Sequence, residues 1–207
     1  MTVSSDPPEI PNIEQLLADL EAEEPLRCIQ ATRLFAEIEE PRAIKPLLKL
    51  LRSDCPLVRV SAAYALGRNH DPSVVEALIQ QMDDWNGYVR KGVVWALGNC
   101  QDQRALPVLM EALRQDIAAV RLWSAGALGT LGSLDAVPVL LEALEDPVAA
   151  VRANVCWALG KLGDPRAIEP MIERLDDEDL SVQQDAQQAL SQFDREDAKE
   201  ALSYALL

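Results

Sequence analysis

The stretch Val151-Arg152-Ala153-Asn154-Val155-Cys156-Trp157-Ala158-Leu159-Gly160 opens with a Val-Arg pair and closes with Ala-Leu-Gly. Both markers return every 31 residues, without insertion or loss. The pair recurs at Val58-Arg59, Val89-Arg90 and Val120-Arg121 and continues as Val182-Gln183, and the triplet recurs at Ala65-Leu66-Gly67, Ala96-Leu97-Gly98 and Ala127-Leu128-Gly129. A fixed period of this length is typical of a solenoid, in which each repeat packs on its neighbours.

Each period has room for two helices. Between Asp71-Pro72 and Asn86-Gly87, apolar residues keep the spacing of one helix face, and a second helix is expected from about Tyr88 to Asn99. The apolar positions of the first helix recur in every period as Leu47, Leu78, Leu109, Leu140 and Met171, and as Leu51, Met82, Leu113, Leu144 and Leu175. The sequence therefore predicts an all-α protein, an α-solenoid (α/α superhelix) of about six two-helix repeats.

The repeat pattern also sets the expected boundaries. Residues 1–11 are polar and proline-rich and are expected to be a disordered N-terminal segment. Residues 12–193 are expected to form a single repeat domain, whose first Val-Arg pair has degenerated to Arg27-Cys28 and whose last repeat is rich in polar residues, as an end cap should be. Residues 194–207 are expected to form a C-terminal capping helix, from about Glu196 to Leu206.

The overall charge narrows the classes of partner. The formal net charge is −15, so the field over most of the surface repels a phosphate backbone, and nucleic acid is not an expected partner. No apolar run approaches the ~20 residues that a bilayer span needs, so no membrane insertion is expected. With four scattered cysteines and no short metal-ligand spacing, we expect a cytoplasmic protein with reduced thiols and no metal site.

The arginine of each Val-Arg pair follows an aspartate by five or six residues, which suggests a structural role. A turn aspartate and a helix-start arginine can pair within one repeat or across to the next, and either arrangement would give a ladder of ion pairs along the stack. The expected members are Asp54, Arg59, Asp84, Arg90, Asp116, Arg121, Asp146 and Arg152. We interpret this pattern as structural rather than ligand-binding.

The segment from Ala158 to Pro170, followed by Asp176-Asp177, resembles the short HEAT-like repeat named after the phycobilisome (bilin) lyases. The earlier copies match this repeat more loosely. The resemblance implies a HEAT-like stack and a cyanobacterial setting. Its family includes bilin lyase subunits, phycobilisome-degradation factors and scaffolds without chemistry, so it implies a fold more strongly than an activity.

In HEAT-type stacks the second helix of each repeat lines the concave face, and several aromatic residues fall on the outward columns of these helices. Tyr64, Trp95 and Trp157 share one column, and Trp123 lies in the adjacent one. Aromatic side chains in a concave stripe are typical anchors for a partner or a planar ligand, although each could equally fill a gap between helices. The full set of expected partner-binding or ligand-binding residues is Tyr64, Arg68, Tyr88, Lys91, Trp95, Trp123, Trp157 and Lys161.

Trp85 replaces the aspartate of the turn column and marks a specialised turn, either as a lid on the neighbouring turn or as an exposed contact. Other reactive side chains give no catalytic pattern. The single histidine, His70, is expected in a solvated turn, and Cys100 and Cys156 occupy columns of small buried hydrophobic residues. An iron–sulfur cluster would need several thiolates to converge, whereas successive repeats lie about 10 Å apart.

Two main functions and one remote alternative fit these observations, and no catalytic residue is assigned. The first is a non-catalytic scaffold that binds a protein partner on its concave face, and the resemblance suggests a phycobiliprotein, a second HEAT-repeat subunit or another part of the photosynthetic assembly. The second is a bilin lyase or lyase-isomerase subunit that attaches phycocyanobilin to a phycobiliprotein cysteine, in which case a bilin would be bound. The third and most remote alternative is an iron–sulfur cluster protein.

Overall fold

The computed structural model describes residues 12–193 and Ala198, and within them it consists of helices and turns arranged as six stacked pairs. The first helices of the pairs, here called A helices, are α1 (Ile13–Leu20), α3 (Ile44–Leu50), α5 (Val75–Gln80), α7 (Leu106–Gln115), α9 (Val137–Ala143) and α11 (Ile168–Glu173). The second helices, here called B helices, are α2 (Pro25–Phe35), α4 (Pro56–Arg68), α6 (Gly87–Cys100), α8 (Ala118–Leu131), α10 (Ala149–Leu162) and α12 (Leu180–Leu190). The expected α-solenoid is confirmed.

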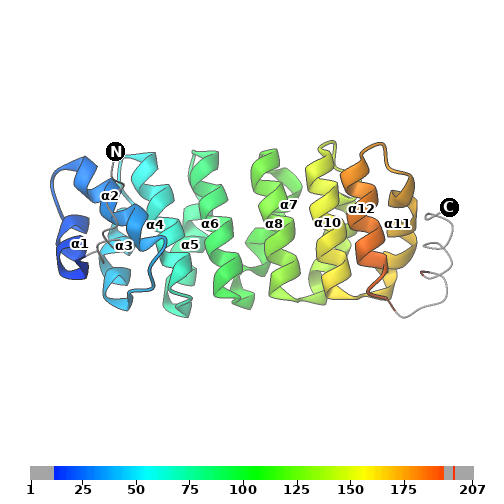
Figure 1. Ribbon diagram of the computed structural model, residues 1–207, viewed down its shortest axis with the longest axis horizontal. Helices are drawn as coiled ribbons and strands as arrows, with labels where there is room; N and C mark the ends of the chain where they lie inside the picture. Colours follow the sequence, from blue (N-terminus) through cyan, green and yellow to red (C-terminus); the bar gives the residue numbers. More distant parts are fainter. Residues whose placement is uncertain (1–11, 194–197, 199–207) are drawn as a thin grey trace, which may run out of the picture.

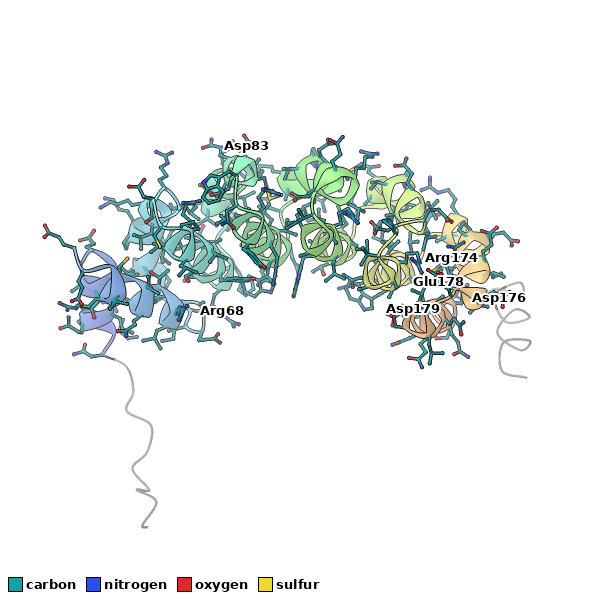
Figure 2. All side chains as sticks on the ribbon, turned by 90° about the horizontal axis from the view of Figure 1, so that it is seen from above. Arg68, Asp83, Arg174, Asp176, Glu178 and Asp179 are labelled. Atoms are coloured by element: carbon teal, nitrogen blue, oxygen red, sulfur yellow. The ribbon has the colours of Figure 1, made fainter. Side chains whose placement is uncertain are left out.

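The pairs follow one another in a single row from the N-terminal to the C-terminal end (Figure 1). Seen from above, the row bends into a shallow arc (Figure 2). Each B helix packs against the next B helix, as α4 does on α6 and α10 on α12. The B helices line the concave side of the arc and the A helices the convex side.

The core is a continuous seam of the apolar columns predicted from the repeat. Leu47, Leu78, Leu109, Leu140 and Met171 are fully buried in the A helices, and Val58, Val89, Val120, Val151 and Val182 are buried in the B helices. In the first repeat, Leu16 and Leu20 are buried beneath the second repeat, as the backward projection of the period indicates. Because each layer is covered by its neighbours, the side chains of successive repeats can be small and uniform.

Each A helix from α3 to α11 begins with a short 3-10 turn that has its own side-chain cap. Before α5, for example, the Asp71 carboxylate accepts a hydrogen bond from the backbone N–H of Ser73 at 2.8 Å, and Pro72 occupies the first position of the turn. Asp102 and Asp164 cap the corresponding turns before α7 and α11 in the same way. The capping side chain, with or without a following proline, therefore marks where an A helix starts.

The predicted disordered segment, residues 1–11, lies outside the described residues, as does the predicted capping helix within 194–207 apart from Ala198. The described helices include none that is both long enough and apolar enough to cross a membrane.

Candidate ligand-binding cavity on the concave face

The arginine of each Val-Arg pair binds the aspartate of the following repeat. Arg59 donates from Nε and Nη2 to the two carboxylate oxygens of Asp84, at 2.6 and 2.9 Å. Arg90 pairs with Asp116 and Arg121 with Asp146 in the same bidentate geometry. The aspartate of the arginine's own repeat contributes its backbone carbonyl instead, as Asp54 does to Nη1 of Arg59.

The members of the ladder therefore differ from the prediction at two aspartates. The Asp54 carboxylate is exposed and is not a member of the ladder, because no earlier repeat supplies an arginine to it. Asp177, which is not among the expected members, has a side chain only 3% exposed and binds Arg152 through both carboxylate oxygens. These hydrogen bonds from Arg152 lower the pKa of Asp177 below its ordinary value.

The glycine of each Ala-Leu-Gly triplet allows two B helices to approach closely. A Cβ at Gly129 would lie 2.8 Å from the Cα of Ala158, and one at Gly67 would lie 2.5 Å from the Cα of Ala96. The same glycines leave room for aromatic rings of the next repeat. The ring of Trp157 packs above Gly129, and that of Trp95 packs above Gly67 in the same way. Part of each indole therefore fills a gap between helices.

The remaining surface of these rings opens into a cavity of about 350 Å³ on the concave side. Trp95 of α6, Trp123 of α8 and Trp157 of α10 all line it, together with Asn99, Asn154 and Asp185. The cavity exists because the aromatic column is interrupted. Gly126 occupies, 31 residues after Trp95 and 31 before Trp157, the position at which those repeats carry an indole.

Two lysine side chains lie over indoles that line the cavity. The Lys161 ammonium lies 5.0 Å from the ring centroid of Trp157, and the Lys91 ammonium lies 5.7 Å from that of Trp123. Both distances are in the range of cation–π contacts. Neither ammonium has a carboxylate partner among the described residues, so both remain available to an anionic group of a ligand.

Among the described residues, Asp185 of α12 is the one acidic residue that lines this cavity, and sequence reasoning did not assign it to the site. Its side chain is half-buried, and within the described part of the chain it has no hydrogen bond or ion pair. Burial raises its pKa above the ordinary value for an aspartate. The repeat position could have identified Asp185, because it lies 62 residues, or two periods, after Trp123 and occupies the same position in its repeat.

Five of the eight predicted binding residues do not line the cavity, namely Lys91 and Lys161, described above, and Tyr64, Arg68 and Tyr88. Tyr64 packs edge-on against the far side of Trp95, with ring centroids 5.1 Å apart. Arg68 lies on the concave side (Figure 2) but donates from Nε to the backbone carbonyl of Ala36, towards the N-terminal end. Tyr88 is 72% exposed at the start of α6 and does not line the cavity.

The specialised turn combines the two roles that were considered for it. Trp85 is 77% exposed, and the guanidinium of Arg59 lies 5.7 Å from its ring centroid. Its indole thus covers the Arg59–Asp84 ion pair of the preceding junction and also presents a large apolar surface to solvent.

The other singled-out side chains lie apart from one another. Cys156 is fully buried, and burial raises the pKa of its thiol to about 12. Cys100 is only half-buried, not fully buried as expected, and its pKa is raised to about 11, again chiefly by burial. His70 is exposed, with Nδ1 3.0 Å from the carbonyl oxygen of Asn99. The described residues contain no group of three or more metal-ligating side chains placed to hold an ion.

Comparison with known families identifies the repeat. A family model for HEAT repeats matches residues 10–91, 75–152 and 137–207, which together span almost the whole chain. The chain belongs to the HEAT-repeat family. No curated protein matches it significantly.

Solved structures share this HEAT-repeat fold over most of its length. The complex of CpcE and CpcF of phycocyanin lyase from Nostoc sp. PCC7120 aligns with a TM-score of 0.73 and 23% identity, covering 97% of this chain and 85% of that one. An engineered protein aligns at 0.68 with 24% identity, covering 93% and 98%. A designed armadillo repeat protein in complex with the peptide (KR)4 aligns at 0.69 with 19% identity, covering 89% and 100%. At these identities the similarity shows the fold.

Proposed function

We propose that this HEAT-repeat protein is a non-catalytic scaffold that receives a protein partner in its concave tryptophan cavity. The proposal rests on one arrangement, in which three consecutive B helices each place an indole at the same cavity. Large aromatic side chains lose little conformational entropy on binding and are typical centres of binding energy. The cavity is also of the size that binding sites commonly have.

Two features indicate the kind of partner: the lysines over the cavity's indoles, and the proteins that share this fold. Lys91 and Lys161 present ammonium groups beside the indoles of a strongly acidic protein, which suits an acidic group on the partner. A lyase complex and a peptide-bound design both share this fold, and these neighbours support a protein ligand. Together with the repeat resemblance, they favour a phycobiliprotein or a second HEAT-repeat subunit, within a photosynthetic assembly.

Titration calorimetry with purified phycocyanin tests this proposal. We expect binding by the unaltered chain and a loss of about thirtyfold or more in affinity for Trp123→Ala, because truncating a central aromatic anchor typically costs about 2 kcal/mol or more. Trp85→Ala is the matched control, since it removes an exposed tryptophan outside the cavity. If the unaltered chain does not bind, or if both variants weaken binding equally, phycocyanin is not a partner of this cavity.

A second function is favoured by Asp185. A cavity with flat indole walls, ammonium groups over two of these indoles and a carboxylate that has no partner among the described residues matches the groups of an open-chain tetrapyrrole, which has a conjugated plane, propionates and pyrrole N–H donors. The chain would then be a subunit of a bilin lyase or lyase-isomerase, in which Asp185 accepts hydrogen bonds from the pyrrole nitrogens and Lys161 binds a propionate. Such a subunit would orient phycocyanobilin for delivery to a cysteine of a phycobiliprotein.

Visible spectroscopy separates the two functions. Addition of phycocyanobilin to the purified chain should shift and sharpen its long-wavelength absorption band if the bilin is bound, and Asp185→Asn should shift the band again by removing a charge near the chromophore. Glu169→Asn is the control, because Glu169 is exposed on α11. An unchanged spectrum together with phycocyanin binding would leave the scaffold function and reject the lyase function.

A further inference from the structure

A second hollow lies around Trp85, on a different side of the arc from the tryptophan cavity. It has a volume of about 490 Å³ and lies between the turn that follows α5 and helix α7. Asp83, one of its lining residues, points outward on the convex side, whereas Arg68 lies on the concave side (Figure 2). A ligand in this hollow would therefore leave the concave cavity free.

The walls of the hollow are apolar and partly uncovered. Trp85 is 77% exposed and Ile117 is 47% exposed, and Met82 and Val108 continue the apolar surface inward. Ile117 is held in place because its side chain packs above Gly87, where a Cβ would lie 2.5 Å from Cδ1. Exposed aromatic and aliphatic side chains around a hollow are typical of an interaction site rather than of an ordinary solvated turn.

The charges that line the hollow are mostly negative. Asp83, Asp84, Glu111 and Asp116 line it, against a single guanidinium, that of Arg90. Asp84 and Asp116 belong to the ladder and are paired with Arg59 and Arg90. Asp83 and Glu111 are exposed, and neither makes an ion pair within the part of the chain that the structure describes. The uncompensated charge at the hollow is therefore negative, and the net charge of −15 reinforces it.

An apolar wall beside two unpaired carboxylates is complementary to a long side chain with a cationic end. Lysine and arginine bury their methylene stems on apolar surface while the charged group stays at the edge, and either cation also stacks favourably on an indole. We propose that this hollow is a second docking site, which takes a lysine or arginine side chain from a basic segment of a partner protein. The stem lies between Trp85 and Ile117, and the cation lies between Asp83 and Glu111.

Fluorescence anisotropy with a labelled octapeptide of alternating lysine and arginine tests this site directly. The double variant Asp83→Asn/Glu111→Gln should bind the peptide about tenfold more weakly than the unaltered chain, since two charge contacts are lost. Trp85→Ala should weaken binding as well, and its exposure means that the fold is preserved, which circular dichroism can verify. High salt should weaken binding to the unaltered chain.

Two controls make the result decisive. Asp135→Asn/Glu169→Gln removes the same number of exposed negative charges elsewhere on the array and should change the affinity less than about twofold. Trp157→Ala alters the concave cavity and should leave peptide binding unchanged. The proposal is overturned if the unaltered chain does not bind the peptide, if both double variants weaken binding equally, or if Trp157→Ala abolishes binding while Trp85→Ala does not. None of these outcomes depends on whether the concave cavity binds phycocyanin or a bilin.

Discussion

The guanidinium of Arg152 donates two hydrogen bonds to the carboxylate of Asp177, 2.9 Å from Nε and 2.6 Å from Nη2, and thereby joins the fifth repeat to the sixth. The same arginine donates from Nη1 to the backbone carbonyl of Asp146 in its own repeat. The Arg152 side chain therefore holds a turn within its own repeat and also fixes the position of that repeat relative to the next one. Because both charged groups are almost fully buried, the pair stabilises the junction only while both partners are present.

Replacement of Asp177 by asparagine should lower the free energy of unfolding by about 3 kcal/mol, because it leaves the buried Arg152 guanidinium with only the exposed Glu178 carboxylate, 3.5 Å away, as a counter-charge. Asp176→Asn is the matched control, since the neighbouring carboxylate is exposed and should contribute within about 0.5 kcal/mol. Urea denaturation followed by circular dichroism measures both variants. Equal stabilities for the two would show that the ion pair contributes little beyond its packing.

Acid should weaken the same junction. The hydrogen bonds from Arg152 hold the pKa of folded Asp177 below the ordinary value of 3.8. The contribution of this carboxylate to the free energy of unfolding is therefore fully present above the ordinary pKa, and it is lost as the pH falls through the pKa of the folded state. Between about pH 5 and pH 2, the stability of the unaltered chain should fall more steeply than that of Asp177→Asn. Parallel stability curves for the two proteins would exclude this linkage.

Gly129→Ala should destabilise the stack by roughly 1–3 kcal/mol, because the new methyl group would meet the backbone of α10 at Ala158 and force two helices apart. Gly126→Ala, one turn away on the same helix, is the control. Its Cβ would lie 3.1 Å from the Nδ2 atom at the end of the Asn154 side chain, which can move. Thermal unfolding compares the two, and a larger loss for Gly126→Ala would contradict the close approach at Gly129.

Gly126→Leu should fill the concave cavity without loss of the fold, because it places an aliphatic side chain where neighbouring repeats carry tryptophan. Acrylamide should quench the tryptophan fluorescence of this variant less than that of the unaltered chain, since part of the indole surface becomes covered. Binding of phycocyanin or of phycocyanobilin should be lost in parallel. Unchanged quenching together with unchanged binding would place the ligand elsewhere.

Cys156 should resist alkylation in the folded protein. Burial raises the pKa of its thiol to about 12, so the reactive thiolate is scarce at pH 8 and the sulfur is also out of reach of reagent. Cys55 is half-exposed in a turn and should react first. Mass spectrometry after brief treatment with iodoacetamide, with and without guanidinium chloride, measures both sites. Rapid native modification of Cys156 would show that α10 opens readily.

The fold follows almost entirely from periodicity, because every repeat buries the same columns. Leu78, Leu109 and Leu140 are all buried at the positions that the 31-residue spacing assigns them. Periodicity could not show which aspartate each arginine binds. Asp54 lies only five residues before Arg59, but the carboxylate that Arg59 binds belongs to Asp84, 25 residues later. Only the handedness and spacing of the stack determine which aspartate meets the guanidinium.

The candidate site was only partly predictable, for a different reason. Trp95 and Trp157 were found because aromatic residues recur in one column of the repeat, and Trp123 was found because it lies in the adjacent column. The cavity itself is made by the absence of a side chain at Gly126, and its acidic member, Asp185, belongs to a repeat whose polar residues are explained equally well by an exposed end. Composition alone cannot distinguish a solvated aspartate from one that faces a cavity.

The bidentate ladder makes the array extensible by whole units. Each arginine needs only a backbone carbonyl of its own repeat and an aspartate of the following repeat. A 31-residue segment copied in frame therefore supplies an aspartate to the repeat before it and an arginine to the repeat after it. Gln183 interrupts this rule: its amide still donates to the carbonyl of Asp177 at 2.6 Å, but it offers no charge to a following aspartate. Replacing Gln183 by arginine would be the first step in lengthening the ladder by design.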